Sequence, residues 1–262
     1  MNEVNPYQSP PAAAADAVTV VDGYIAGGRT VDAGRGWEWI ASGFELFKKQ
    51  PGIWVLLFVV FAVCVTLVGL VPLLGSVATM LLSPVFGAGF MLGCREQENN
   101  QELTIEHLFA AFKQSTGDLI IVGLLSMAAM VAILVPVFLI VGGAGLFAGA
   151  YGGAFNFAAM GLGVLLAVLI ALTLTIPVGM ALWFAPALVV FHNLKPAQAL
   201  KDSFLACLKN MIPFTLYSLV LLVLAVIAAI PLGLGFLVLI PVAIASIYAA
   251  YRDIFFTHRS AS

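Results

Sequence analysis

The chain has 262 residues, of which 62% are hydrophobic and only 9% are charged, and its formal net charge is -2 at pH 7. Soluble domains carry about 25% charged residues, so this composition excludes an ordinary soluble protein and predicts a polytopic membrane protein. The slightly negative charge also argues against a nucleic-acid partner, because such binding requires a basic face.

Residues 1–36 carry prolines, alanines and glycines without a regular apolar period, which is typical of a disordered segment. We therefore expect a disordered cytoplasmic tail over residues 1–36. The first long apolar run begins only near Ile53, and no basic head followed by an apolar core precedes it, so the segment is not typical of a secretory signal.

An amphipathic helix is predicted just before the first apolar run. Trp37, Ile40, Phe44 and Phe47 recur at helical spacing, with charged side chains between them. A helix with tryptophan at one end and lysine at the other suits the headgroup layer of a membrane. Two similar stripes follow, at residues 105–113 and 197–211.

The apolar runs predict six membrane spans, because each is long enough to cross a hydrocarbon core of about 30 Å. Pro72 and Gly75 divide the first uncharged run into two spans, and a glycine-rich piece divides the second run into two more. The predicted spans lie at about residues 53–72, 76–95, 119–141, 160–191, 211–230 and 233–252.

The fourth predicted span is too long to cross a membrane as a straight, upright helix. A helix over residues 160–191 would measure about 48 Å. We therefore expect it to tilt, or to kink at Pro177 and Pro186. The segment before it, residues 142–159, is either an external loop or a partly inserted re-entrant segment.

The charged residues indicate an orientation for the six spans. All 11 Lys and Arg residues and all 13 Asp and Glu residues lie in the N-terminal segment, the loops at 95–118 and 192–209, or the C-terminal end. Six spans place these segments on one side, which the positive-inside rule assigns to the cytoplasm together with both termini. The predicted organisation is a six-helix transmembrane domain over residues 37–256, between the N-terminal tail and a cytoplasmic tail over residues 257–262.

An internal repeat organises these elements. Pro84 lies 11 residues before Arg95, Pro241 lies 11 residues before Arg252, and a third Pro-Val pair occurs at Pro177. Each proline falls in the second helix of a predicted hairpin, and each hairpin follows one amphipathic stripe. We therefore predict an all-α polytopic membrane protein, with six transmembrane helices as three repeated hairpins, each preceded by an amphipathic interfacial helix.

The same pattern carries a family resemblance, most clearly in the segment FAPALVVFHNLKPAQALKDSFLACLKN at residues 184–210. It resembles an uncharacterised family of bacterial polytopic inner-membrane proteins, and it is similar to the membrane domain of some glycerophosphodiester phosphodiesterases. The resemblance covers about residues 37–256. It implies a bacterial plasma-membrane location and a six-helix domain without established catalytic residues. The soluble phosphodiesterase domain has no counterpart here, so that activity is not carried over.

The spans offer no ionised acid, base or metal ligand for catalysis. His107, His192 and His258 lie far apart in the sequence near predicted membrane boundaries, which favours interfacial histidines over a metal site. We expect no enzymatic activity, no metal and no cofactor. The lack of ionisable residues within the spans also argues against a proton-coupled transporter.

Three prolines and neighbouring hydroxyls are the remaining candidates for a site. Proline removes a backbone hydrogen bond and bends a helix, and a nearby hydroxyl can satisfy the freed carbonyl. The repeat predicts that the three kinks face a shared axis and line a central cavity. The candidate helix-break or cavity positions are Pro84, Pro177, Pro241, Thr79, Ser83 and Thr175.

Two functions remain open at this point. The leading hypothesis is a non-catalytic integral inner-membrane protein with a role in scaffolding, assembly or membrane organisation. The alternative is a carrier or channel for an uncharged or lipid-like solute through the central cavity. The expected contacts are the lipid bilayer and a membrane-protein partner or a second copy of the chain, without nucleic acid.

Overall fold

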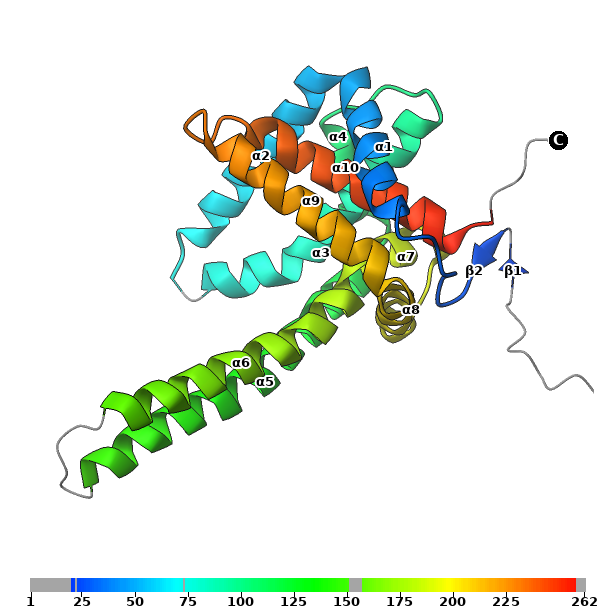
Figure 1. The fold of residues 1–262 in the computed structure, drawn as a ribbon. Coiled ribbons are helices and arrows are strands. Elements are labelled where there is room, and N and C mark those ends of the chain that lie inside the picture. The colour runs from blue at the N-terminus through cyan, green and yellow to red at the C-terminus, as the bar shows by residue number, and fades with distance from the viewer. Residues whose placement is uncertain (1–19, 22, 73, 151–156, 258–262) are drawn as a thin grey trace, which may run out of the picture.

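A computed structural model describes residues 20–21, 23–72, 74–150 and 157–257 (Figure 1). Within this part of the chain the fold is helical apart from one short antiparallel strand pair, β1 (Val20–Val21) and β2 (Tyr24–Ile25), in which Val20 pairs with Ile25. The helices are α1 (Arg35–Lys49), α2 (Pro51–Gly69), α3 (Leu74–Glu98), α4 (Glu106–Gln114), α5 (Thr116–Ala150), α6 (Phe157–Trp183), α7 (Ala185–His192), α8 (Pro196–Lys209), α9 (Met211–Ala229) and α10 (Phe236–Phe255).

Six segments of the described chain are long and apolar enough to cross a membrane, as the sequence predicted. Each overlaps one predicted span, because uninterrupted apolar runs of about 20 residues form helices that match a bilayer core. The six segments are Pro51–Gly69, Leu74–Glu98, Thr116–Ile140, Val164–His192, Met211–Ala229 and Phe236–Phe255.

The fourth span breaks between α6 and α7, next to one of the two prolines predicted to kink it. Pro186 has no N–H group and crowds the preceding turn, which ends the helix at Trp183. Ser203 of α8 bridges the break. Its hydroxyl accepts a hydrogen bond from the Phe184 amide (2.9 Å) and donates one to the Met180 carbonyl (2.7 Å). The hydroxyl thus stands in place of the helical bond between these two residues.

Helix α5 is longer than the sequence predicted. It continues through Ala150, so residues 142–150 form neither a loop nor a re-entrant turn, and residues 151–156 of that predicted segment lie outside the described chain. Each glycine costs a helix only about 1 kcal/mol relative to alanine, which the neighbouring helix α6 can offset by packing. At 35 residues, α5 measures about 52 Å and exceeds the thickness of a bilayer core.

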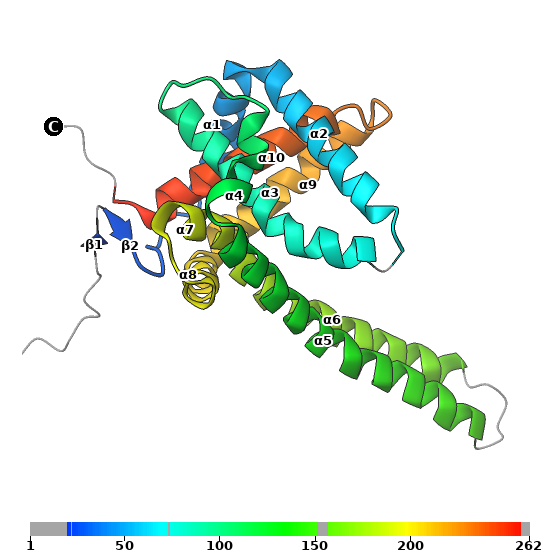
Figure 2. The same cartoon turned by 180° about the vertical axis from the view of Figure 1, so that it is seen from behind.

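Three short helices pack across the longer ones near one end of the molecule. Helix α1 lies against α10, α4 against α3, and α8 against α6 (Figures 1 and 2). Two of these crossings require glycine. A Cβ atom on Gly43 of α1 would lie 2.6 Å from the Ser246 amide nitrogen of α10, and one on Gly89 of α3 would overlap the Leu108 carbonyl oxygen of α4.

The segment before α1 is ordered where the structure describes it, contrary to the tail predicted over residues 1–36. Tyr24 and Ile25 are buried, and Tyr24 forms an antiparallel bridge with Phe256. The amide of Arg29 donates to the Ile254 carbonyl at 2.9 Å, and Lys209 and Asn210 bind carbonyls of the same segment. The contacts join residues more than 170 positions apart, so no local pattern could reveal them. Residues 1–19 of the predicted tail lie outside the described chain.

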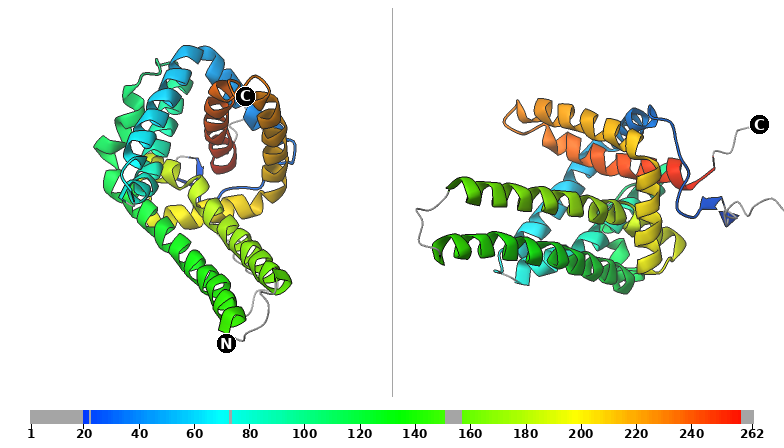
Figure 3. Two further views of the ribbon diagram at one scale, coloured as in Figure 1. Left: turned by 90° about the vertical axis from the view of Figure 1, so that its left-hand side faces the viewer. Right: turned by 60° about the horizontal axis from the view of Figure 1, so that its bottom comes forward.

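The helices differ sharply in how much of each is buried. Of the residues in the most apolar stretch of each span, 56% are buried in α3 and 50% in α10, but only 22% in α5 and 6% in the α6–α7 span. Helices α5 and α6 form a long antiparallel pair that extends away from the remaining helices (Figure 1). The α2–α3, α5–α6 and α9–α10 pairs all extend away from the side on which β1, β2 and the end of α10 lie (Figure 3).

Candidate functional site

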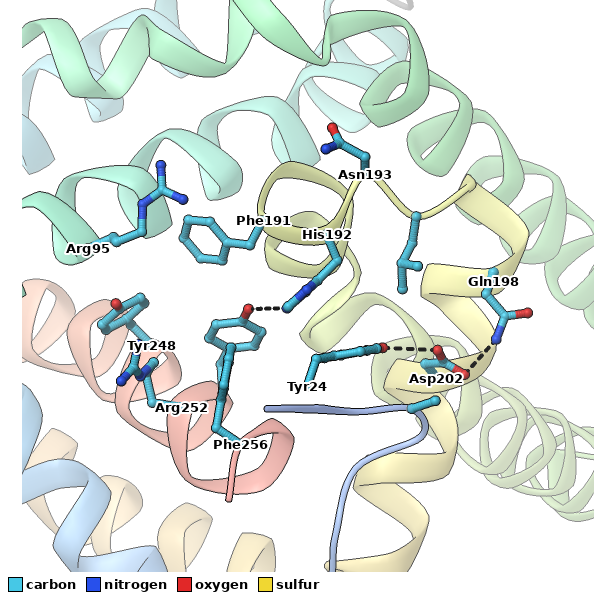
Figure 4. A pocket seen from close by; sticks show the side chains of 13 residues that line it. Tyr24, Arg95, Phe191, His192, Asn193, Gln198, Asp202, Tyr248, Arg252 and Phe256 are labelled. Atoms are coloured by element: carbon cyan, nitrogen blue, oxygen red, sulfur yellow. Dashed lines mark hydrogen bonds between the residues drawn. The ribbon is translucent and has the colours of Figure 1, made fainter. Parts of the chain in front are cut away.

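A cavity of about 650 Å³ lies where the ends of α3, α7, α8 and α10 meet strand β2 (Figure 4). Its volume falls in the range of about 300–1,000 Å³ that is usual for small-ligand sites. The side chains that give it chemical character are Tyr24, Arg95, His192, Asp202, Tyr251 and Arg252.

Two arginines lie on one side of this cavity, and each rests on an aromatic ring. The Arg95 guanidinium of α3 lies 4.7 Å from the ring centre of Phe191, and the Arg252 guanidinium of α10 lies 4.9 Å from that of Phe256. Stacking of this kind holds a guanidinium by cation–π attraction while its N–H groups stay free to bind other partners. The two arginines are therefore positioned in advance of any ligand.

A carboxylate lies beside one of these arginines. Glu98 Oε2 is 3.4 Å from Arg252 Nη1, and the same oxygen accepts a hydrogen bond of 2.5 Å from the Tyr248 hydroxyl. Arg95 has a weaker ionic neighbour, since its Nε lies 4.0 Å from Glu96 Oε1. The Glu98 carboxylate thus partly neutralises the positive charge of Arg252, and Glu96 neutralises that of Arg95 to a smaller extent.

A hydrogen-bonded chain forms the opposite wall. The Tyr24 hydroxyl donates to Asp202 at 3.1 Å, and Gln198 donates to the other oxygen of that carboxylate at 2.8 Å. Burial, followed by the adjacent Asp202 charge, raises the pKa of Tyr24, so the phenol stays protonated. The Tyr24 ring also packs on His192 with 4.0 Å between ring centres, and His192 Nε2 lies 2.7 Å from the Tyr251 hydroxyl. This wall is held in place by its own partners.

A buried ion cluster centred on Asp253, the residue after Arg252 in α10, lies next to the site. Asp253 accepts hydrogen bonds from Arg29 Nη2 at 2.8 Å, Arg35 Nε at 2.6 Å and Trp39 Nε1 at 2.9 Å. The bond to Asp253 raises the pKa of Arg35 above its usual value. Since one buried carboxylate meets two cations and an indole, this cluster ties the N-terminal segment and α1 to α10.

The structure does not bring the six sequence-predicted positions together. Thr79, Ser83 and Pro84 line a separate open cavity of about 580 Å³, which also involves Pro186. Pro241 is buried where α1 crosses α10, whereas Pro177 is exposed. The hydroxyl of Thr175 donates to the Ala171 carbonyl at 2.7 Å, and not to the Thr173 carbonyl that Pro177 deprives of its N–H partner.

The histidines and cysteines occupy different surroundings. His192, which the sequence placed alone at a boundary, belongs to the wall of the cavity, while His107 accepts a hydrogen bond from the Thr104 amide at 3.0 Å. His258 lies outside the described residues. Burial raises the pKa of Cys207 to about 12, so this thiol stays protonated and unreactive. Among the described residues, no group of three or more His, Cys, Asp or Glu side chains could hold a metal ion.

The sequence contained one signal for this cavity. The equal offset from Pro84 to Arg95 and from Pro241 to Arg252 marked two charges at matching positions, and both arginines line it. Tyr24 and Asp202 were missed because one was assigned to a disordered tail and the other to the polar face of a helix. Their partners become visible only in three dimensions.

The hydrogen-bonded groups around Asp202 and Asp253 form a polar layer at one end of the six apolar spans. Together they define a multi-pass helical membrane protein. A comparison with known proteins agrees. The chain is 32% identical over 250 residues to the probable inner membrane protein BTH_II0599 of Burkholderia thailandensis, an alignment that covers 86% of this chain and 92% of the relative. The chain therefore belongs to the family of this inner membrane protein.

Two further comparisons returned no match. No protein-family model matches the chain, and no solved structure matches it. The similarity to the membrane domain of some glycerophosphodiester phosphodiesterases stays a prediction, because the name of the Burkholderia relative mentions only the inner membrane.

Proposed function

We propose that this protein is a non-catalytic scaffold of the bacterial inner membrane. In this proposal, the polar layer near α1, α3 and α10 forms a stable base, and the α5–α6 pair offers an apolar surface to a partner within the bilayer. One observation carries the proposal: each of the other two helix pairs contains one half-buried helix, α3 or α10, whereas both members of the α5–α6 pair are largely uncovered.

The polar layer supports a structural role for its buried charges. The Asp253 carboxylate contacts Arg29, Arg35 and Trp39, and the Asp202 carboxylate contacts Tyr24 and Gln198. A catalytic acid or base must exchange protons with a substrate, whereas these carboxylates bind neighbouring side chains from distant parts of the chain. Such bonds favour a role in holding the fold together.

The proposed architecture is three hairpins, each preceded by an amphipathic helix that lies along the cytoplasmic membrane surface, with both termini cytoplasmic. The packing of the short helices supports it. Helix α4 precedes the second hairpin and packs on α3 of the first, and α8 precedes the third hairpin and packs on α6 of the second. Helix α1 precedes the first hairpin and packs on α10 of the third, which closes the cycle. Such a ring is the arrangement expected of parallel repeats about an axis normal to the membrane.

The mass of the protein in native-lipid nanodiscs tests the scaffold. We expect the chain to be recovered in a complex heavier than one copy, either with a second copy or with another membrane protein. Leu134→Ser and Leu172→Ser together, on exposed positions of α5 and α6, should reduce that complex, while Leu67→Ser on the exposed face of α2 should leave it intact. A monomer in every sample, with only lipid bound, would contradict the scaffold.

A carrier for an uncharged or lipid-like solute is the second candidate. It rests on the open cavity of about 580 Å³ near Pro84, which four hydroxyl residues line together with apolar ones: Ser76, Thr79, Ser83 and Ser126. Movement of a fluorescent lipid or neutral solute across reconstituted vesicles, slowed by Ser83→Leu, would favour this function over the scaffold. Equal rates with and without the protein would exclude it for that probe.

A further inference from the structure

The cavity lined by Arg95 and Arg252 has a charge pattern that points to a ligand. Figure 4 shows both arginines on one side, with Asp202 on the opposite side and aromatic rings between them. Arg95 comes from the end of α3 and Arg252 from the end of α10, so two helices far apart in sequence deliver like charges to one space. Like charges brought together repel one another, so this arrangement favours occupation by an anion.

The geometry of the two groups narrows the class of anion. A guanidinium presents its N–H donors as a planar fork that matches two oxygens of a carboxylate or a phosphate. Two guanidinium groups held on separate rings, Phe191 and Phe256, can engage different oxygens of one ligand. A tetrahedral phosphate offers oxygens in several directions, whereas a carboxylate offers two in one plane. The pair therefore suits a phosphate better.

We propose that this cavity binds a phosphate group between Arg95 and Arg252, with the aromatic walls around Tyr248 and Tyr251 contacting the organic part of the ligand. Both arginines lie at the ends of apolar spans, where a phospholipid presents its headgroup, and basic pockets between helices at this depth suit anionic headgroups. A water-soluble phosphate ester shares the same chemistry. The proposal does not depend on the scaffold function.

Glu98 sets the affinity of this site. Its carboxylate lies 3.4 Å from Arg252 and competes with an incoming phosphate for the same guanidinium. Neutralising Glu98 should therefore strengthen phosphate binding, while neutralising either arginine should weaken it. Opposite effects from adjacent residues are not expected of a merely structural cluster, in which every loss weakens the fold.

Native mass spectrometry of the full-length protein in detergent tests the proposal. The probes are phosphatidylglycerol, diacylglycerol as the matching lipid without phosphate, and inorganic phosphate and glycerol phosphate as soluble sources. We expect one phosphatidylglycerol retained per chain and no retention of diacylglycerol. Arg95→Gln and Arg252→Gln should each weaken retention about tenfold, the effect of losing one charge-assisted bond. Glu98→Gln should strengthen it several-fold.

Lys113→Gln is the matched control, because it removes one positive charge from an exposed residue of α4 outside the cavity. A third outcome is that inorganic phosphate or glycerol phosphate binds but phosphatidylglycerol does not, and that both arginine variants weaken this binding. That result would support the phosphate site and show that its ligand is water-soluble. Binding by none of the probes, or equal weakening by Lys113→Gln, would overturn the proposal. If the arginine variants fail to fold, the Glu98→Gln variant tests the proposal by itself. Unchanged or weaker retention of phosphatidylglycerol by this variant would overturn the proposal.

Discussion

The α5–α6 pair and the layer formed by α1, α3 and α10 are built in opposite ways. In the layer, half or more of the apolar stretch of α3 and α10 is buried, and charged or polar groups such as Asp253 and Ser246 have partners at its core. In the pair, most of the described side chains face outward, and Ser203 of α8 makes its hydrogen bonds near the base, at the α6–α7 break. Mean hydropathy is lower in the half-buried spans α3 and α10 than in the α5–α6 pair, so the most apolar spans are those whose side chains face outward.

The comparison predicts that two leucines of one span differ strongly in their effect on stability. Leu188 of α7 is fully buried, whereas Leu172 of α6 is 59% exposed. We expect Leu188→Ala to lower the free energy of unfolding by about 2–5 kcal/mol, because it leaves a cavity. Leu172→Ala should change it by less than about 0.5 kcal/mol. Unfolding in mixed micelles measures both, and similar losses would show that stability does not depend on whether a leucine of this span is buried or faces outward.

Removing a buried charge from the layer should lower the stability of the protein more than removing an exposed charge. Asp253→Asn leaves Arg29 and Arg35 beside a neutral side chain, and we expect a loss of about 3 kcal/mol. The control is Glu45→Gln, since Glu45 pairs with Lys48 on the exposed face of α1 and such pairs contribute about 0–1 kcal/mol. Thermal unfolding of the two variants makes the comparison. Equal stability would show that Asp253 is dispensable to the layer.

The loss of stability should be smaller at the α6–α7 break, where Ser203 bridges the two helices. Ser203→Ala removes the hydroxyl that links the Phe184 amide to the Met180 carbonyl, leaving two buried backbone groups without it. We expect a loss of about 1–2 kcal/mol. Ser42→Ala, at an exposed position of α1, should be nearly neutral. If Ser203→Ala is equally neutral, the α6–α7 break is held by packing rather than by the hydroxyl.

Much of this architecture could be predicted from the sequence, for physical reasons that are local. Long apolar runs predicted the six spans. Of the two prolines predicted to kink the fourth span, only Pro186 lies at its break, since α6 continues through Pro177. The layer and the cavity depend on long-range contacts instead. Asp253 meets Arg29 across 224 positions, and Tyr24 meets Asp202 across 178, so neither pair leaves a local pattern. The glycine-rich run that begins at Gly142 was wrongly predicted to end the helix, since each glycine weakens a helix by only about 1 kcal/mol relative to alanine.

Photocrosslinking in living cells tests the central claim, that the α5–α6 pair is built for contact and the layer for stability. A photoreactive residue would replace Leu172 on the pair and, for comparison, the exposed Leu67 on α2. The account predicts a protein adduct of one defined mass at Leu172 and lipid adducts at Leu67. Lipid adducts alone at both positions, or the same protein adduct at both, would contradict it.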